Sequence, residues 1–384
     1  MVVFGGCVAV GPACLPRIGE GFSLSLSQRG LLGSVLMSAL LASLLVAGHY
    51  ADRTGKRPFL VAGMVVIGLG LAFISRANAY LALLLGNAML GAGKGAMEAL
   101  VNPLVAELDP YTAPRRLNIV NGMFSVGLVI AAVAAGEMLI RGVSWRTVYL
   151  PWIPAALIVA WLFAARHYPR PVAPPEAADG TGAASIARFL KSPVFWVLVV
   201  AMVMGGGCEA GMTFWGANFT EREFGATDRT AALTVAVFGA FMAVGRFGTG
   251  ALVTRMRPIT LMQVSAGLCA LATLGLYFVQ GLYGAWAMYA LGGLFVACFW
   301  PTLLAVAALE IESGSAALFA LLAAAGIAGC GLFPWVIGKV GDLAGLRAGS
   351  LVLPISMVIE LLTLLVAARL AGNGDESRVS PSSR

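Results

Sequence analysis

The segment Gly91–Pro103, GAGKGAMEALVNP, is glycine-rich and apolar, yet it contains a lysine, a glutamate and an asparagine. On an α-helix Lys94, Glu98 and Asn102 follow one another at intervals of four residues, so they share one stripe. A carboxyl group partly removed from water can exchange a proton near neutral pH, and an ammonium or an amide can bind a polar solute. Lys94 and Glu98 can equally pair with each other across one helical turn.

Other polar residues also stand inside apolar stretches. Asn118 and Asn121, with Ser125, form a second helical stripe, which suits either hydrogen bonding to a solute or contact between helices. Glu209 follows the triple glycine Gly205–Gly207 and is expected to face a cavity, because an ionisable residue in lipid is costly.

The remaining candidates have structural explanations beside the functional ones. We expect Arg246 to be a structural partner, Glu360 to have a supporting role, and Glu137 to lie at a membrane interface. Trp215 and Trp300 can stack on the face of a sugar, or can fill the space between helices.

The composition places these residues in a membrane protein. The chain has 384 residues, of which 59% are hydrophobic and only 11% charged, and runs such as Gly30–Ala47 carry no charge. A soluble protein of this size could not bury so much apolar surface. The net charge of +7 is spread over short spacers, which is typical of membrane helix flanks and argues against nucleic acid binding. The six cysteines lie in apolar runs and are expected to be free thiols.

Twelve spans of about 20 apolar residues can be counted. They lie near residues 1–16, 28–50, 58–75, 80–106, 117–140, 147–165, 193–219, 230–253, 259–279, 284–309, 315–338 and 348–370. The fold class predicted is an all-α integral membrane protein, with twelve transmembrane helices in two pseudo-symmetric six-helix bundles. The first and seventh helices are predicted to be broken in mid-membrane, at Gly11–Pro12 and at the triple glycine, because paired broken helices mark the central site of many transporters.

The domain boundaries follow from one long polar stretch. We expect a first bundle over residues 1–165, a cytoplasmic linker over 166–192, a second bundle over 193–371 and a cytoplasmic tail over 372–384. One set of alternate loops holds 14 Lys and Arg, and the opposite set holds 9. This bias predicts that both termini are cytoplasmic in a multi-pass protein of the inner or plasma membrane.

The segment Gly48–Arg57, GHYADRTGKR, resembles the signature loop of the major facilitator superfamily. The resemblance implies that its Asp and Arg latch the two bundles in one conformation. An Arg five residues after a Gly recurs at Gly250–Arg255, 202 residues later, which indicates an internal duplication. The gating residues expected are Gly48, Asp52, Arg53, Gly55, Arg57 and Arg255.

Several segments resemble one branch of that superfamily, the fucose–galactose–glucose:proton symporters. They are MEALVNPLVAELDP (97–110), RRLNIVNGMFSVG (115–127), GGCEAG (206–211), GRFGTG (245–250), FWPT (299–302) and GLFPWVIGKVGD (331–342). The resemblance implies alternating access, sugar uptake coupled to protons, and a proton- and substrate-linked role for Glu98. Two positions depart from the pattern. Pro12 stands where the family's fucose transporter has an aspartate, and Lys94 stands where an apolar residue is expected, which opens the possibility of an anionic solute.

The function predicted is secondary active transport of a small polar solute, a sugar or sugar derivative that can be anionic, with the proton as coupling ion. One alternative is proton-driven efflux of amphiphilic compounds on the same fold, and another is a non-transporting membrane sensor. The chain shows no catalytic cluster and no metal-ligand set, so neither an enzyme nor a cofactor is expected. The expected partners are a small molecule and the lipid bilayer, with a monomer as the default of the superfamily. The substrate- or proton-binding residues predicted are Glu98, Lys94, Asn102, Asn118, Asn121, Glu209, Trp215 and Trp300.

Overall fold

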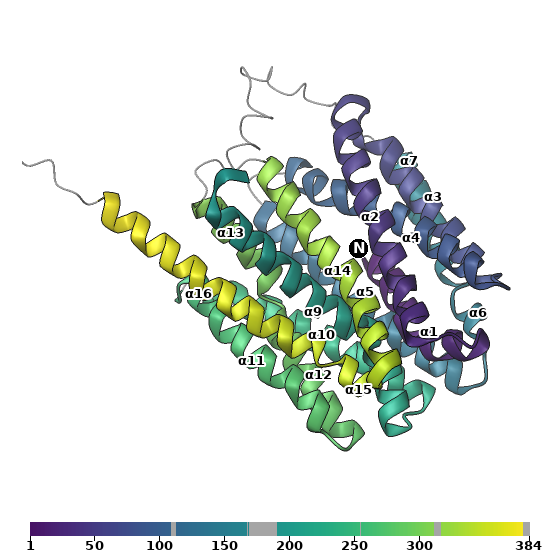
Figure 1. Ribbon diagram of the computed structural model, residues 1–384. Helices are drawn as coiled ribbons and strands as arrows, with labels where there is room; N and C mark the ends of the chain where they lie inside the picture. Colours follow the sequence, from purple (N-terminus) through teal and green to yellow (C-terminus); the bar gives the residue numbers. More distant parts are fainter. Residues whose placement is uncertain (109–112, 167, 169–189, 254, 311–315, 379–384) are drawn as a thin grey trace, which may run out of the picture.

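The fold is built from helices that run roughly side by side in two groups (Figure 1). The computed structural model describes residues 1–108, 113–166, 168, 190–253, 255–310 and 316–378. Within these residues eleven helices are long and apolar enough to cross a membrane. Helix α4 is not among the eleven, because Asn87, Lys94 and Glu98 lower its apolar character, but it packs between α2 and α3 in the same bundle. The chain is therefore an all-helical membrane protein, as its composition predicts.

The first bundle contains the helices up to residue 165. They are α1 (Val2–Gly21), α2 (Leu26–Thr54), α3 (Lys56–Ser75), α4 (Tyr80–Leu108), α5 (Ala113–Ile140), the short α6 (Trp145–Val148) and α7 (Trp152–Ala165). Helix α2 begins at a capping box, in which Ser25 and Gln28 satisfy each other's backbone amides. It ends at Gly55, whose φ of 88° suits glycine, so the turn into α3 depends on this residue.

The second bundle contains the helices from residue 193. They are α9 (Pro193–Phe224), α10 (Asp228–Leu252), α11 (Pro258–Phe278), α12 (Leu282–Val296), α13 (Phe299–Glu310), α14 (Ala316–Ala344), the short α15 (Leu346–Gly349) and α16 (Val352–Arg378). Helix α16 continues past residue 371, where the bundle was predicted to end. Most of the predicted linker and the last six residues of the tail lie outside the described residues.

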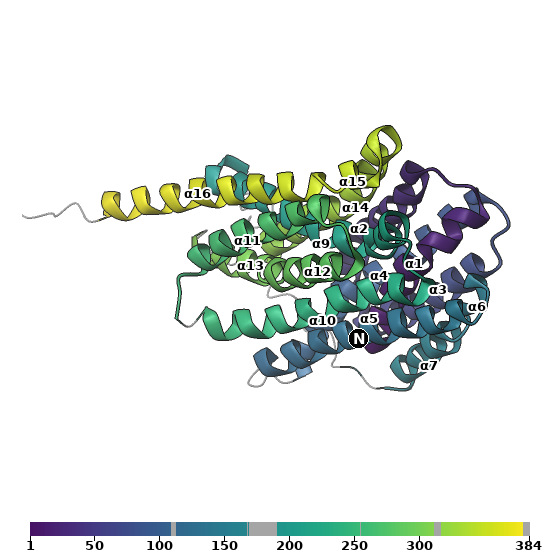
Figure 2. The same cartoon turned by 90° about the horizontal axis from the view of Figure 1, so that it is seen from below.

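The bundles meet mainly along α2 with α14, α5 with α10, and α1 with α9, and α1 also contacts α10. Figure 2 shows α1 to α7 on one side and α9 to α16 on the other. The molecule has two opposite ends, each marked by the connections between helices that lie there. The α1–α2 end also carries the α9–α10 connection, and the α2–α3 end also carries the α10–α11 connection.

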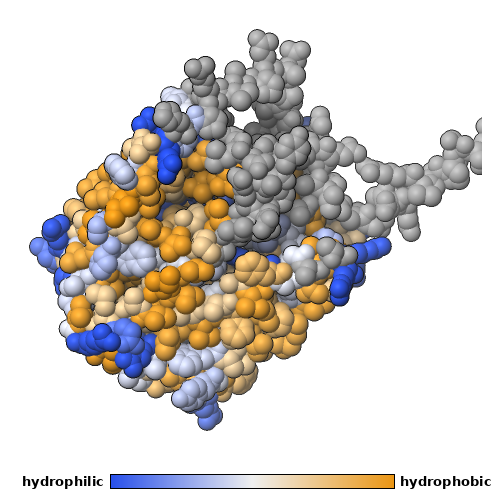
Figure 3. Space-filling view, turned by 180° about the vertical axis from the view of Figure 1, so that it is seen from behind, coloured by the Kyte–Doolittle hydropathy of each residue, from blue (hydrophilic) through white to orange (hydrophobic). Residues whose placement is uncertain are grey.

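The outer flanks of both bundles are apolar. Trp161, Leu271 and Phe278 are 66%, 66% and 67% exposed, and Figure 3 shows hydrophobic residues over much of one face, with hydrophilic ones towards its edges. In water such a surface would be unfavourable, whereas in a bilayer it contacts lipid.

The predicted breaks in the first and seventh helices are wrong. Helix α1 runs without interruption through Pro12 and Pro16, and α9 runs through the triple glycine. Proline is tolerated inside a membrane helix because neighbouring groups can satisfy the freed carbonyl. The glycines instead allow close packing, since a Cβ on Gly206 would stand 2.6 Å from the Gly326 carbonyl oxygen of α14.

Candidate functional site

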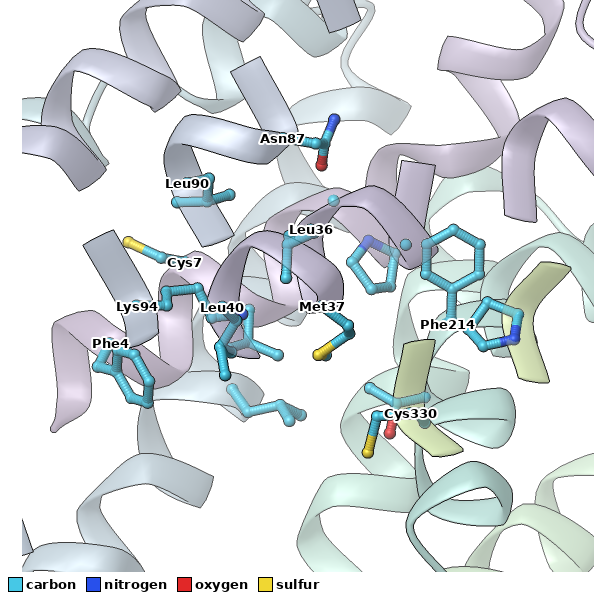
Figure 4. Close-up of a pocket in the computed structure, with 18 of the residues that line it drawn as sticks. Phe4, Cys7, Leu36, Met37, Leu40, Asn87, Leu90, Lys94, Phe214 and Cys330 are labelled. Atoms are coloured by element: carbon cyan, nitrogen blue, oxygen red, sulfur yellow. The ribbon is translucent and has the colours of Figure 1, made fainter. Parts of the chain in front are cut away.

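A cavity of about 190 Å³ lies between the two bundles. Helices α1, α2, α4 and α5 of the first bundle and α9, α10 and α14 of the second contribute to its wall. Most of this wall is apolar, with Phe4, Leu36, Met37 and Phe214 among its members (Figure 4). A cavity with apolar walls and a few polar groups is typical of a small-molecule site.

Lys94 lines this cavity and is only 2% exposed. Its ammonium lies 5.8 Å from the centroid of the Phe4 ring of α1, and Figure 4 shows it amid Phe4, Cys7 and Leu40. In the described part of the chain this ammonium has no hydrogen bond and no ion pair, so the pairing with Glu98 that the helical spacing also allows is not formed. The lysine is therefore held by a cation–π contact and by the field of more distant charges.

Glu98 lines the same cavity from the next turn of α4 and is half-buried. The charges within electrostatic reach of its carboxyl group come from both bundles: Lys94 from the first, and Arg246 and Glu209 from the second. A carboxyl group in this position faces solute, or the water that replaces it, rather than lipid.

Glu209 of α9 also lines the cavity, and the Arg246 guanidinium donates to its carboxylate over 3.2 Å. The side chain of Glu209 is 24% exposed and that of Arg246 29% exposed, so the pair is partly desolvated. Arg246 is thus a structural partner of Glu209, as expected. The second bundle brings one paired carboxylate to the cavity, while the first brings a lysine and a carboxylate that do not pair.

Trp215 and Trp300 are not among the described residues that line the cavity. The Trp215 indole is buried and donates to the carbonyl of Pro334 over 3.0 Å. Trp300 is half-buried, and its ring lies against the α14 backbone at Gly326. Both rings fill space within the second bundle, which was the alternative to stacking on a sugar.

The structure says less about the three asparagines that were predicted to bind solute or proton. Asn102 is half-buried on α4, two turns beyond Lys94, and is not among the residues that line the cavity. Asn118 and Asn121 belong to α5, but their side chains lie outside what the structure describes. Ser125 on the same stripe is buried, and its hydroxyl has no hydrogen-bond partner among the described residues.

The expected gating residues gather at the α2–α3 end. Gly48 is exposed near the end of α2, and Gly55 makes the turn into α3. Arg57 donates to the backbone carbonyl of Ala164 of α7, a contact within the first bundle. Arg255 is exposed in the α10–α11 connection. Asp52 and Arg53 are helical residues of α2, and their side chains lie outside the described ones.

The described polar contacts between the bundles lie at the α1–α2 end and at mid-height. The Arg17 guanidinium donates twice to Asp228, over 2.7 and 2.8 Å. The carboxylate of Asp342 accepts from the backbone amides of Leu26 and Ser27 at the start of α2, over 2.7 and 2.9 Å. These four hydrogen bonds, two between α1 and α10 and two between α2 and α14, hold the bundles together beyond the cavity, so the cavity is closed towards this end.

Glu137 belongs to this closure, although it was predicted to be merely interfacial. Its carboxylate pairs with Arg229 of α10 over 2.5 Å, and with Arg141, the residue that follows α5, over 3.5 Å. A residue near a membrane surface can pair across two bundles, but the partner lies 92 residues away and cannot be found from spacing.

Glu360 of α16 is fully buried away from the cavity, and within the described ranges neither carboxyl oxygen has a hydrogen-bond partner. Among the described residues no group of three or more His, Cys, Asp or Glu is placed to hold a metal ion.

Asn87, Phe4 and Tyr149 line the cavity without having been predicted to do so. Asn87 stands seven residues before Lys94 on α4, so it continues the stripe of polar residues and could have been found from the sequence. The other two come from α1 and from the segment between α6 and α7, which no local pattern on α4 reveals.

Residues 1–328 match the Major Facilitator Superfamily. The chain belongs to this superfamily of membrane transporters. Multidrug resistance protein MdtL of Salmonella paratyphi C is 27% identical over 263 residues, and that of Salmonella typhi is 25% identical over 262. Each match covers 66% of this chain and 64% of the relative, so the chain matches just under two-thirds of the length of these relatives.

Solved structures show the same fold at lower identity. A bacterial homolog to human lysosomal transporter Spinster, in an inward-facing and occupied conformation, has a TM-score of 0.76 and 18% identity, with 98% of this chain and 94% of that chain covered. FucP in the outward conformation has a TM-score of 0.68 and 21% identity, with 95% and 96% covered. A variant of nucleoside transporter NupG has a TM-score of 0.77 and 14% identity, with 96% and 98% covered. The chain therefore has the fold of the superfamily.

Proposed function

We propose that this transporter couples proton movement to the transport of a small organic solute by alternating access. The observation that supports this most directly is the meeting of Lys94 and Glu98 of one bundle with the Glu209–Arg246 pair of the other around a single cavity. Ionisable residues inside a membrane are expensive, roughly 2.5–3.5 kcal/mol each by insertion scales, and mark ion and substrate pathways. Glu98 is the carboxylate proposed to carry the proton, because it has no ion-pair partner among the described residues.

The closed α1–α2 end indicates which conformation of the proposed transport cycle this structure represents. The positive-inside bias predicts that this end faces away from the cytoplasm. The conformation is then one in which the outer side is sealed by the Arg17–Asp228, Glu137–Arg229 and Asp342–α2 contacts. In this proposal the signature loop at the α2–α3 end, with Asp52 and Arg53, forms the corresponding contact in the opposite state.

Two observations bear on the solute, and they favour different classes. The resemblance of the fourth helix to the fucose–galactose–glucose:proton symporters, and the likeness to FucP, favour a sugar or sugar derivative. The apolar walls at Leu36, Met37 and Phe214, and the relatives described as multidrug resistance proteins, favour an amphiphilic compound. The proton-coupled mechanism is common to both.

Proton coupling can be tested in proteoliposomes that contain a trapped pH indicator. Candidate solutes are added with and without an imposed pH gradient, and proton movement and solute uptake are recorded together. The Glu98→Gln variant should lose proton movement. Glu223→Gln is the matched control, because Glu223 pairs with Arg347 over 3.0 Å within the second bundle and does not line the cavity. Undiminished coupled transport in Glu98→Gln at every pH and gradient would show that the assignment is wrong.

A further inference from the structure

The Lys94 ammonium is a buried charge without an ion-pair partner among the described residues. It lines the cavity, it is 2% exposed, and in the described part of the chain no group accepts a hydrogen bond from it. An ammonium has three donors, and a buried donor is stable only when an acceptor or water satisfies it. The direction in which Lys94 can find an acceptor is the cavity itself.

Neither of the two carboxylates that line the cavity forms an ion pair with Lys94. Glu98 stands one turn away on the same helix and forms no ion pair with Lys94. Glu209 comes from the other bundle and accepts from Arg246 over 3.2 Å. The remaining titratable groups within reach are the thiols of Cys7 and Cys330, which are weak acceptors. The full positive charge of Lys94 therefore acts on whatever occupies the cavity.

The wall next to Lys94 is aromatic and aliphatic. Phe4 lies beside the ammonium, and Leu36, Met37 and Phe214 continue the wall away from it (Figure 4). Such a surface favours an apolar body and offers a sugar few hydrogen-bond partners. Met37 also lines a second groove between α2 and α14, with Leu41 and Trp335, so the apolar surface continues beyond the cavity.

We propose that the cavity binds an amphiphilic organic anion. Its carboxylate head accepts hydrogen bonds from Lys94, and its apolar body packs against Phe4, Met37 and Phe214. This inference rests on the proposed function only in placing the solute in the central cavity, and it names the class of solute. A lipophilic cation is expected to bind more weakly than the anion, because the Lys94 ammonium repels a positive charge beside it.

The test uses three probes of nearly the same shape, which are 2-naphthoate, 2-naphthalenemethanol and 2-naphthylmethylammonium. Binding to the purified protein in lipid nanodiscs is measured by calorimetry, with empty nanodiscs as the blank. A charge-assisted hydrogen bond in a cavity predicts that the anion binds at least about tenfold more tightly than the alcohol, and that the cation binds most weakly.

The variants identify the residue responsible. Lys94→Met should abolish the preference for the anion, while Lys94→Arg should retain most of it. Lys339→Met is the matched control, because it removes the same charge from an exposed position on α14. An equal or inverted order of the three probes in the wild type overturns the proposal, even where Lys94→Met fails to fold. A Lys94→Met variant that keeps the anion preference also overturns it.

Binding is measured without any gradient, so its outcome is independent of proton coupling. A protein that binds the anion selectively but moves no protons with it refutes the proposed function and leaves this inference standing. A protein that couples protons to the transport of cations or neutral solutes, and shows no preference for 2-naphthoate, refutes this inference alone.

Discussion

Replacing Asp228 by Asn tests whether the contacts at the α1–α2 end hold the two bundles in the closed state. Asp228 is the first residue of α10 and accepts two hydrogen bonds from Arg17 of α1. The substitution leaves Arg17 paired with Glu20 over 2.8 Å, so no buried charge is orphaned. The Arg17 side chain is 47% exposed and that of Asp228 11%, which places the pair between a surface and a buried ion pair. Its loss should cost the closed state about 1 kcal/mol, which is about a fivefold change in the ratio of closed to open forms.

The ratio can be followed by pulsed spin-label distance measurements between the bundles. Leu81 and Tyr283 are suitable sites, because both lie at the α1–α2 end, on opposite bundles, and are 64% and 82% exposed. The native cysteines are buried or half-buried, and Cys330, which lines the cavity, is replaced by Ala in the background. Asp228→Asn should increase the long-distance population about fivefold relative to the parent.

The matched control is Glu223→Gln, which removes a carboxylate that pairs with Arg347 inside the second bundle. It should leave the distance distribution unchanged. If Asp228→Asn also leaves it unchanged, the bidentate contact does not stabilise closure and our reasoning about this end is wrong. If both variants shift it equally, the effect is one of general destabilisation.

Three further changes have definite expected outcomes. Gly206→Ala should lower the melting temperature of the purified protein, because its Cβ would stand 2.6 Å from the Gly326 carbonyl oxygen, whereas Gly267→Ala, with no atom within 4 Å, should not. Glu360→Leu should raise the melting temperature by an amount equivalent to about 1–3 kcal/mol, because it removes a fully buried carboxyl group whose oxygens have no partner in the described part of the chain; a lower melting temperature would refute this reasoning. Glu98→Gln should retain solute binding but lose solute-driven proton movement in proteoliposomes, and loss of binding instead would make it a solute ligand.

The sequence predicts the helices well, because a span of about 20 apolar residues has few alternatives in a chain this poor in charge. It misses that the tenth predicted span, 284–309, is divided into α12 and α13, and it underestimates the lengths of some other helices. Helix α1 continues to Gly21 and α9 to Phe224, since helices extend beyond the apolar core where hydropathy no longer identifies them. It misreads glycine and proline, because the same Gly-Gly-Gly serves a broken helix or a close helix contact. Only the α14 backbone opposite Gly206 distinguishes the two.

The candidate site is predictable only within one helix. Spacing places Lys94 and Glu98 on one face of α4, and both line the cavity. Spacing also allows them to pair, but the direction of the lysine side chain is set by Phe4 of α1, which no local pattern contains. Glu209 and Arg246 are 37 residues apart in the sequence, and Arg17 and Asp228 are 211 apart. Contacts of this kind depend on how the bundles dock.

The absence of a Lys94–Glu98 ion pair has a consequence for coupling. With all four groups ionised, Lys94 and Arg246 balance Glu98 and Glu209, so the cavity is formally neutral. A bound monoanion makes it negative, and one proton on a carboxylate restores neutrality. Moving one net charge through a membrane potential involves about 2.3 kcal/mol per 100 mV, so the neutral, doubly loaded cavity can reorient without that work. Anion and proton then strengthen each other's binding by linkage. If Lys94 and Glu98 formed an ion pair, neither group would be available for this coupling. Because they are separate on α4, the Lys94 ammonium can bind the anion and the Glu98 carboxylate can bind the proton.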